Sequence, residues 1–134
     1  MMQRRKFIQL AAMGSAAVGM TGTGCHNRHP AFYSILDKPG ALSQICDLQT
    51  VREIGKAYRL QAPSESDAGR LVALLSSDSA GNPIPSASDN AFVQGLIRQK
   101  IGRDFETGNT VIVKGWILAV TEARQCALLY VNNQ

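Results

Sequence analysis

Apolar residues recur at steps of three and four in three stretches of this chain, and that spacing places them on one face of a helix. The stretches cover residues 47–61, 62–78 and 89–108. Their apolar positions are, in order, Leu48, Val51, Ile54 and Tyr58, then Leu71, Leu74 and Leu75, then Phe92, Val93, Leu96, Ile97, Ile101 and Phe105. The pattern predicts three amphipathic helices. A shorter helix is predicted before them in KPGALSQIC, where Pro39 lies near the first turn.

Capping residues mark the ends of these helices, because a short polar side chain can accept a hydrogen bond from a free backbone N–H of the first turn. The predicted N-caps are, in order, Asp47, then Ser64 or Ser66 with Asp67 in the first turn, then Asp89 or Asn90. Gly108 is predicted to end the third helix, since glycine adopts the left-handed conformation at little cost.

The apolar period changes after Gly108. The runs TVIV and WIL, residues 110–113 and 116–118, are rich in β-branched and aromatic residues, and Lys114 and Gly115 separate them. This arrangement predicts a short β-hairpin.

The segment AVTEARQCALLYV, residues 119–131, returns to a helical pattern, with Thr121 as the predicted N-cap and Glu122 in the first turn. Its part CALLYV is apolar around most of the helix. Such a helix is either the centre of the core or is covered by another protein. The candidate interface residues are Trp116, Cys126, Leu128, Leu129 and Tyr130.

Together these elements predict one mainly α domain over residues 38–134, a small bundle of about four helices with a short β-hairpin before the C-terminal helix. The small, polar and proline residues of 79–90 predict a loop. The expected core consists of Leu48, Val51, Leu71, Leu75, Leu96, Ile97, Phe105 and Trp116.

Residues 1–25 have the order of a bacterial export signal, with basic residues first and then an apolar stretch of about a dozen residues that is too short to span a membrane. The stretch is only weakly apolar and follows paired arginines. It therefore resembles a twin-arginine signal, and the residues that carry this resemblance are Arg4, Arg5 and Phe7. An ordinary secretory signal is the alternative.

The leader ends near Cys25, which follows Thr23 and Gly24 as the lipidated cysteine of a lipoprotein does. The sequence is compatible with a lipidated Cys25 and with an unmodified one. With an acyl group, residues 26–37 would form a tether that holds the domain at a membrane surface.

The charge of the chain argues against a nucleic-acid partner. Its formal net charge is +4, but three of its 14 basic residues, Arg4, Arg5 and Lys6, belong to the leader. The remaining 11 basic residues face 10 acidic ones, so the mature chain lacks the excess of positive charge that phosphate binding requires.

No stretch of the sequence carries a complete catalytic motif. Cys46 and Cys126 lie in apolar surroundings and are expected to be buried thiols, with a disulfide as the alternative. The two histidines, His26 and His29, both fall in the predicted tether, so the domain has no Cys/His pair and no metal set. The carboxylates nearest the hairpin, Asp104, Glu106 and Glu122, are interpreted as ligands of helix ends.

The segment FVQGLIRQKIGRDFETG resembles part of the small subunits of membrane-associated periplasmic sugar and alcohol dehydrogenases, which accompany the FAD-binding subunit of sorbitol, fructose or gluconate dehydrogenase. The residues that carry this resemblance are Leu96, Ile97, Arg98, Asp104, Phe105 and Gly108, together with the leader residues Arg4 and Arg5. The resemblance covers about a third of the chain.

This resemblance implies a non-catalytic accessory subunit that escorts and stabilises an exported flavoprotein. It also implies that the chain binds no cofactor itself, that FAD sits on the large partner, and that the twin-arginine translocase carries the folded complex to the periplasm. The alternative function is a stand-alone lipid-anchored binding module, which would use the loop Asn82–Ser88 and the hairpin with Trp116 as its contact surface.

Overall fold

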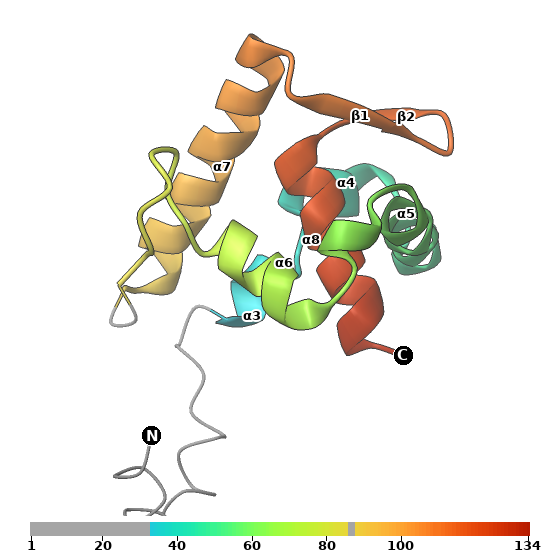
Figure 1. The fold of residues 1–134 in the computed structure, drawn as a ribbon, viewed down its shortest axis with the longest axis horizontal. Helices are drawn as coiled ribbons and strands as arrows, with labels where there is room; N and C mark the ends of the chain where they lie inside the picture. Colours follow the sequence, from blue (N-terminus) through green and yellow to red (C-terminus); the bar gives the residue numbers. More distant parts are fainter. Residues whose placement is uncertain (1–32, 86–87) are drawn as a thin grey trace, which may run out of the picture. The chain divides into compact units, whose positions relative to one another are not determined.

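The structure, a computed structural model, describes residues 33–85 and 88–134 of the chain (Figure 1). Its elements are, in chain order, α3 (Tyr33–Leu36), α4 (Gly40–Ile45), α5 (Leu48–Gln61), a 3₁₀ turn (Pro63–Glu65), α6 (Ala68–Leu75), α7 (Asn90–Thr107), β1 (Thr110–Val113), β2 (Trp116–Ala119) and α8 (Val120–Asn132). The four longest helices, α5 to α8, have eight or more residues. The predicted fold class, mainly α with a hairpin before the C-terminal helix, is confirmed.

The folded body begins earlier than the sequence predicts. The predicted tether runs to residue 37, yet Tyr33–Leu36 form α3, and the side chains of Ile35 and Leu36 are buried in the core. Apolar contacts therefore fix this segment to the domain. The predicted export signal and the rest of the predicted tether lie outside the described residues.

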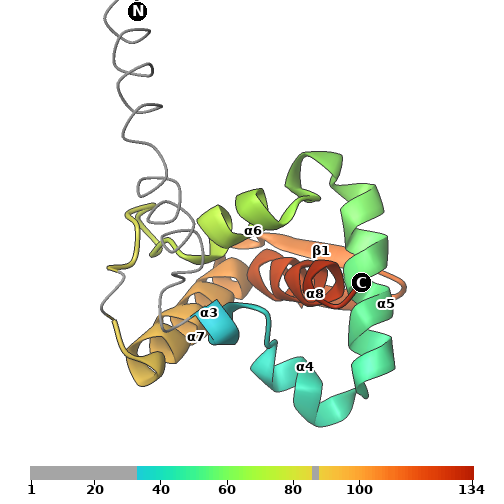
Figure 2. The ribbon, with the colours of Figure 1, turned by 90° about the horizontal axis from the view of Figure 1, so that it is seen from below.

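Helix α8 occupies the centre of the domain, and Figure 2 shows α4, α5, α6 and α7 arranged around it. Its middle turns are buried, with Ala123, Cys126 and Ala127 fully removed from solvent and Leu128 almost so. Helices α5, α6 and α7 and both strands contact it. The sequence left two explanations for this apolar helix, and the structure shows that it is the centre of the core.

Helix α5 packs closely against α8 at a glycine. A Cβ atom placed on Gly55 would lie 2.1 Å from the carbonyl oxygen of Cys126 and 2.9 Å from the backbone nitrogen of Ala127. Real Cβ atoms are never so close to a backbone, so only glycine allows the two helices to touch here. Glycine weakens a helix by about 1 kcal/mol relative to alanine, and the close contact explains its presence in the middle of α5.

The predicted apolar stripes are buried in their middle and exposed at their ends. Val51, Ile54 and Tyr58 of α5 are buried as expected, but Leu48, in the first turn, is 64% exposed. Along α7, Val93 and Ile97 are buried, whereas the two phenylalanines near its ends are about half exposed. The helices extend beyond the surface of α8 that they pack on, so the predicted core is wrong at Leu48 and Phe105. Trp116 is half-buried rather than central.

Most of the predicted helix ends are confirmed by hydrogen bonds. The Oδ1 atoms of Asp47 and Asp89 each accept from a backbone N–H of the first turn at 2.8 Å, and Gly108 has a φ of 75°. Two predictions are wrong. Asp67 caps α6 in place of the serines, and α8 begins at Val120, before Thr121.

The β-hairpin is confirmed, and the conformation of its turn explains the presence of a glycine there. Lys114 and Gly115 have φ angles of 50° and 85°, the conformation of the two-residue turn whose twist suits antiparallel strands. Val113 pairs with Trp116, and Ile112 pairs with Ile117. One face of the hairpin packs on the domain through Val113 and Leu118, and Figure 1 shows the strands lying across the end of the helices.

We predict that Gly55→Ala destabilises the domain by about 3 kcal/mol or more, because the added methyl group forces α5 and α8 apart. Equilibrium denaturation followed by circular dichroism measures this loss. Gly95→Ala in α7 is the matched control: a Cβ atom at this position would have no atom within 4 Å, so the better helix propensity of alanine should raise stability by about 0.5 to 1 kcal/mol. Equal changes in stability for Gly55→Ala and Gly95→Ala would contradict the close contact between Gly55 and the backbone of α8.

Candidate functional site

The predicted site residues fall into two groups. The export and lipidation residues Arg4, Arg5, Phe7 and Cys25 lie outside the described residues. The five candidate interface residues are described, and they do not form one surface. The side chains of Trp116, Leu129 and Tyr130 are half-buried, and the guanidinium of Arg59 lies 5.5 Å from the centre of the Tyr130 ring.

The other two candidate interface residues belong to the interior. Cys126 is fully buried and Leu128 is 1% exposed within this chain alone. Both side chains belong to the core that α8 forms with its neighbours, so no partner can reach them while the domain is folded. They are therefore removed from the candidate interface.

Both cysteines of the described residues are free thiols, Cys126 buried and Cys46 partly buried. Burial raises the pKa of the Cys126 thiol to about 12, with a smaller contribution from Glu122. Because the thiolate is the reactive form, Cys126 is inert at neutral pH.

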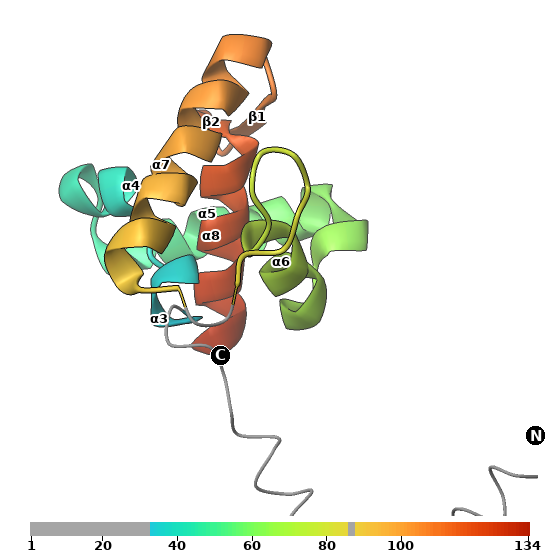
Figure 3. The ribbon, with the colours of Figure 1, turned by 90° about the vertical axis from the view of Figure 1, so that its left-hand side faces the viewer.

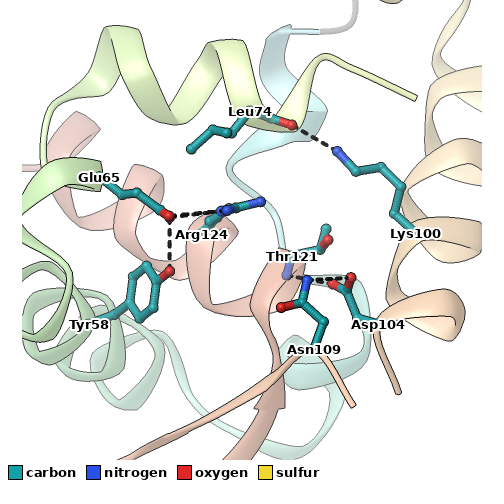
Figure 4. Close-up of polar contacts among 8 residues, drawn as sticks. All are labelled: Tyr58, Glu65, Leu74, Lys100, Asp104, Asn109, Thr121 and Arg124. Atoms are coloured by element: carbon teal, nitrogen blue, oxygen red, sulfur yellow. Dashed lines mark hydrogen bonds and ion pairs between the residues drawn. The ribbon is translucent and has the colours of Figure 1, made fainter. Parts of the chain in front are cut away.

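A polar network connects α5, the 3₁₀ turn and α8 (Figure 4). The Arg124 guanidinium donates from Nε to Glu65 Oε1 at 2.8 Å and from Nη2 to Oε2 at 3.1 Å, which is a two-pronged ion pair. The Tyr58 hydroxyl donates to the same Oε1 at 2.8 Å. The hydrogen bond from Arg124 holds the pKa of Glu65 below its usual value, whereas burial raises the pKa of Tyr58 to about 12.

Lys100 joins α7 to the end of α6. Its Nζ donates to the carbonyl oxygen of Leu74 at 2.9 Å and to that of Leu75 at 3.4 Å, where the last turn of α6 leaves carbonyls without helical partners. Burial lowers the pKa of Lys100 to about 8, and the positive charge of Arg124 adds to the effect.

Asp104 connects the end of α7 with the start of α8. Its Oδ2 accepts from the backbone N–H of Thr121 at 2.9 Å, and its Oδ1 accepts from the side chain of Asn109 at 3.1 Å. Glu122 accepts from the backbone N–H of Ala119 at 3.0 Å. Asp104 and Glu122 thus accept hydrogen bonds from backbone N–H groups at the start of α8, which agrees with their interpretation as side chains that stabilise helix ends.

Some of these residues, Lys100, Asp104 and Arg124, line a crevice of about 390 Å³ between α6, α7 and the first turns of α8. Four basic side chains line it, Arg70, Lys100, Arg103 and Arg124, together with Asp78 and Asp104. Lys100 and Asp104 of this crevice bind helix ends and Arg124 forms an ion pair, whereas the side chains of Arg70 and Arg103 are exposed. The sequence did not single out Glu65, Lys100 or Arg124, since no local pattern shows which distant partners they meet.

Within residues 33–85 and 88–134 there is no group of three or more His, Cys, Asp or Glu side chains that could hold a metal ion. The same residues contain no helix that has both the length and the apolar character needed to cross a membrane.

The predicted contact loop after α6 is partly fixed to the domain. Ile84 is buried and its N–H donates to the Ser76 carbonyl at 2.7 Å, while Asp78 Oδ1 accepts from the backbone N–H groups of Ala80 and Asn82. Asn82 itself is exposed. The exposed residues of this part of the loop are Asn82, Pro83 and Pro85, so it presents one amide and two prolines to a partner.

The outer face of the hairpin is the most apolar exposed feature of the sheet. Ile112 and Ile117 face each other across the two strands and are 62% and 67% exposed. The name hairpin face is used below for these two residues. An antiparallel sheet with one face in water normally places polar residues there, so two isoleucines are unexpected.

The chain was compared with protein-family models, with curated proteins and with solved structures, and no match was found in any of the three.

We predict that Glu65→Gln lowers the free energy of unfolding by about 1.5 to 3 kcal/mol at neutral pH, because a half-buried Arg124 loses its charged partner. The folded-state pKa of Glu65 is lowered, so its stabilisation is complete above the unfolded value of 4.5 and is lost as the pH falls through the folded value. The difference in free energy of unfolding between wild type and variant, measured by urea denaturation, should therefore shrink as the pH falls below 4.5.

Glu53→Gln is the control for this prediction. Glu53 is exposed on α5 and accepts from the exposed side chain of Gln49 at 3.3 Å, so its loss should cost less than about 0.5 kcal/mol. If the difference in free energy of unfolding between wild type and Glu65→Gln stayed constant with pH, the charge of the carboxylate would not be the cause of the stabilisation.

Proposed function

We propose that this chain is a non-catalytic accessory subunit that binds an exported flavin-dependent dehydrogenase through its hairpin face. The observation that carries the proposal is the exposed pair Ile112 and Ile117, 62% and 67% accessible on a two-stranded sheet. Large apolar side chains gathered on a surface mark sites of contact with another protein more often than single ones do.

The geometry of the hairpin suits a contact surface. Its inner residues Val113 and Leu118 are buried in the domain, so the strands are held firmly while their outer residues point away. A rigid apolar surface binds a partner with little loss of conformational freedom. Trp116 pairs with buried Val113, so its half-buried side chain lies on the inner face of the hairpin and does not add to the hairpin face.

In the proposed complex, this chain would supply contacts and the large partner would supply the flavin chemistry. The described residues hold helix ends, ion pairs and an apolar core, and the chemistry is assigned to FAD on the large partner. On this proposal the chain itself binds no cofactor. The paired arginines Arg4 and Arg5 would direct the folded complex to the twin-arginine translocase and so to the periplasm, and an acyl group on Cys25 would hold it at the membrane surface.

The test of this function is to purify the tagged chain from membranes of its own host, identify co-purifying proteins by mass spectrometry and record the absorbance spectrum of the eluate. A stoichiometric flavoprotein with a flavin spectrum is the expected result. A colourless monomer would contradict the proposal that this chain is a subunit of a flavoprotein complex. If Cys25 of that monomer also carried an acyl group, the stand-alone binding module would be favoured.

We predict that Ile112→Ser with Ile117→Ser lowers the recovery of the partner at least about tenfold, because the interface loses its apolar centre. The isolated variant should keep the circular dichroism spectrum and the thermal midpoint of the wild type, since both side chains are exposed. Ile45→Ser with Leu48→Ser is the matched control, as these residues are 70% and 64% exposed on other elements. Loss of the partner in the control alone would place the interface elsewhere.

We also predict that Arg4→Lys with Arg5→Lys retains the flavoprotein in the cytoplasm together with this chain, because one signal serves the complex. Fractionation followed by dehydrogenase activity in the periplasm measures this effect. A flavoprotein that is exported normally beside the double variant would show that it does not depend on this leader.

A further inference from the structure

The crevice between α6, α7 and α8 collects positive charge. Figure 3 shows α6 and α7 on two sides of α8, with the segment that follows α6 between them. The crevice has a volume of about 390 Å³. Its charged lining consists of the basic side chains Arg70, Lys100, Arg103 and Arg124 and the acidic side chains Asp78 and Asp104. A cleft in which one sign of charge prevails concentrates ions of the opposite sign.

Lys100 and Arg124 form the inner part of this basic lining, and each has donors to spare. Arg124 uses Nε and Nη2 for Glu65, and Lys100 Nζ donates to the carbonyl oxygens of Leu74 and Leu75. A guanidinium and an ammonium group carry more N–H donors than these bonds use. In Figure 4 a nitrogen atom of Arg124 points away from Glu65, toward the side on which Lys100 lies.

The two inner cations are close enough to repel each other. Burial is the main cause that lowers the pKa of Lys100 to about 8, the charge of Arg124 adds to the effect, and Asp104 and Asp78 oppose it. Lys100 is therefore still mostly protonated at neutral pH, beside a second cation. Charges in a partly buried place interact more strongly than in water. An anion between Lys100 and Arg124 would replace this repulsion by attraction.

The carboxylates of the crevice do not supply that anion. Residues 33–85 and 88–134 contain two ion pairs, of which only that of Arg124 with Glu65 lies at the crevice. Both oxygens of Asp104 already accept hydrogen bonds, and Oδ1 of Asp78 accepts from two backbone N–H groups of the loop after α6. These two carboxylates therefore stabilise local structure, and Lys100 has no ion pair with a carboxylate of the described residues.

Arg70 of α6 and Arg103 of α7 lie at the outer side of the crevice. Both side chains are exposed, and neither forms an ion pair with a carboxylate of the described residues. With Lys100 and Arg124 they bring donors from three helices to one space. A phosphate group has acceptor oxygens in several directions, whereas the two oxygens of a carboxylate lie in one plane, so donors from several sides suit a phosphate group.

We propose that this crevice binds a phosphate group, either free phosphate or a small phosphate monoester, between the spare donors of Lys100 and Arg124 and with Arg70 and Arg103 on its outer side. The proposal does not depend on the proposed function, because the hairpin face contributes no residue to the crevice. The nearly neutral charge of the mature chain argues against a polyanion such as nucleic acid, whereas one small anion needs only these local donors.

Inorganic phosphate and acetate are suitable probes, since they differ in charge and in the arrangement of their oxygens. With the chain purified from its host, phosphate is expected to bind saturably in calorimetry at constant ionic strength and to shift the Nε–H signal of Arg124 in NMR spectra. Acetate is expected to bind at least about tenfold more weakly. No saturable phosphate binding, equal affinity for acetate, or an unchanged Arg124 signal would overturn the proposal.

Glycerol phosphate distinguishes the two sources of the phosphate group. Tighter binding than that of inorganic phosphate would identify a monoester as the ligand, because its organic part gains contacts in the crevice. Weaker binding would identify free phosphate.

Variants give a second test. Arg70→Gln with Arg103→Gln is expected to weaken phosphate binding at least about tenfold and to keep the thermal midpoint of the wild type, because both side chains are exposed. Lys56→Gln with Arg98→Gln is the matched control: it removes the same charge from exposed positions of α5 and α7 that do not line the crevice, and it should leave the affinity unchanged. Equal losses in the two double variants would show that net charge attracts phosphate, and would refute the site.

Discussion

The contact of Gly55 with the backbone of Cys126 is the constraint on which the rest of this domain depends. It lets α5 approach α8 closely enough that no side chain separates them, since a Cβ at Gly55 would lie 2.1 Å from a carbonyl oxygen. Such close helix packing fixes the axis of α8 in the domain. Helices α6 and α7 and the hairpin then pack on the sides of α8 that α5 leaves free.

Burial of α8 creates the polar network, because a central helix takes its polar groups into the interior. The N–H of Thr121 meets Asp104, Arg124 meets Glu65, and each of these partners comes from a distant element. An unpaired charge or N–H at these positions would cost more free energy than the pairs gain. The position of α8 therefore explains why charged groups line the crevice.

The sequence predicted what depends on neighbouring residues. The caps at Asp47 and Asp89, the left-handed Gly108 and the turn at Lys114 and Gly115 are local and were confirmed. The predictions failed where contacts between elements distant in the sequence determine the structure. Leu48 continues an apolar stripe beyond the reach of α8, and Thr121 needs no capping role because Asp104 arrives from another helix. Nor could any spacing reveal that Arg124 would meet Glu65, or that α3 would fold into the core.

The agreement between pattern and environment fails at several places in the described residues, where apolar side chains are exposed or polar atoms are buried without partners. At Ile112 and Ile117 apolar side chains face water, and at Gln125 a carbonyl oxygen is buried without a donor. Folded chains tolerate such conflicts mainly where function requires them, because each one lowers stability. The partner proposed above would cover the two isoleucines and so remove the first conflict.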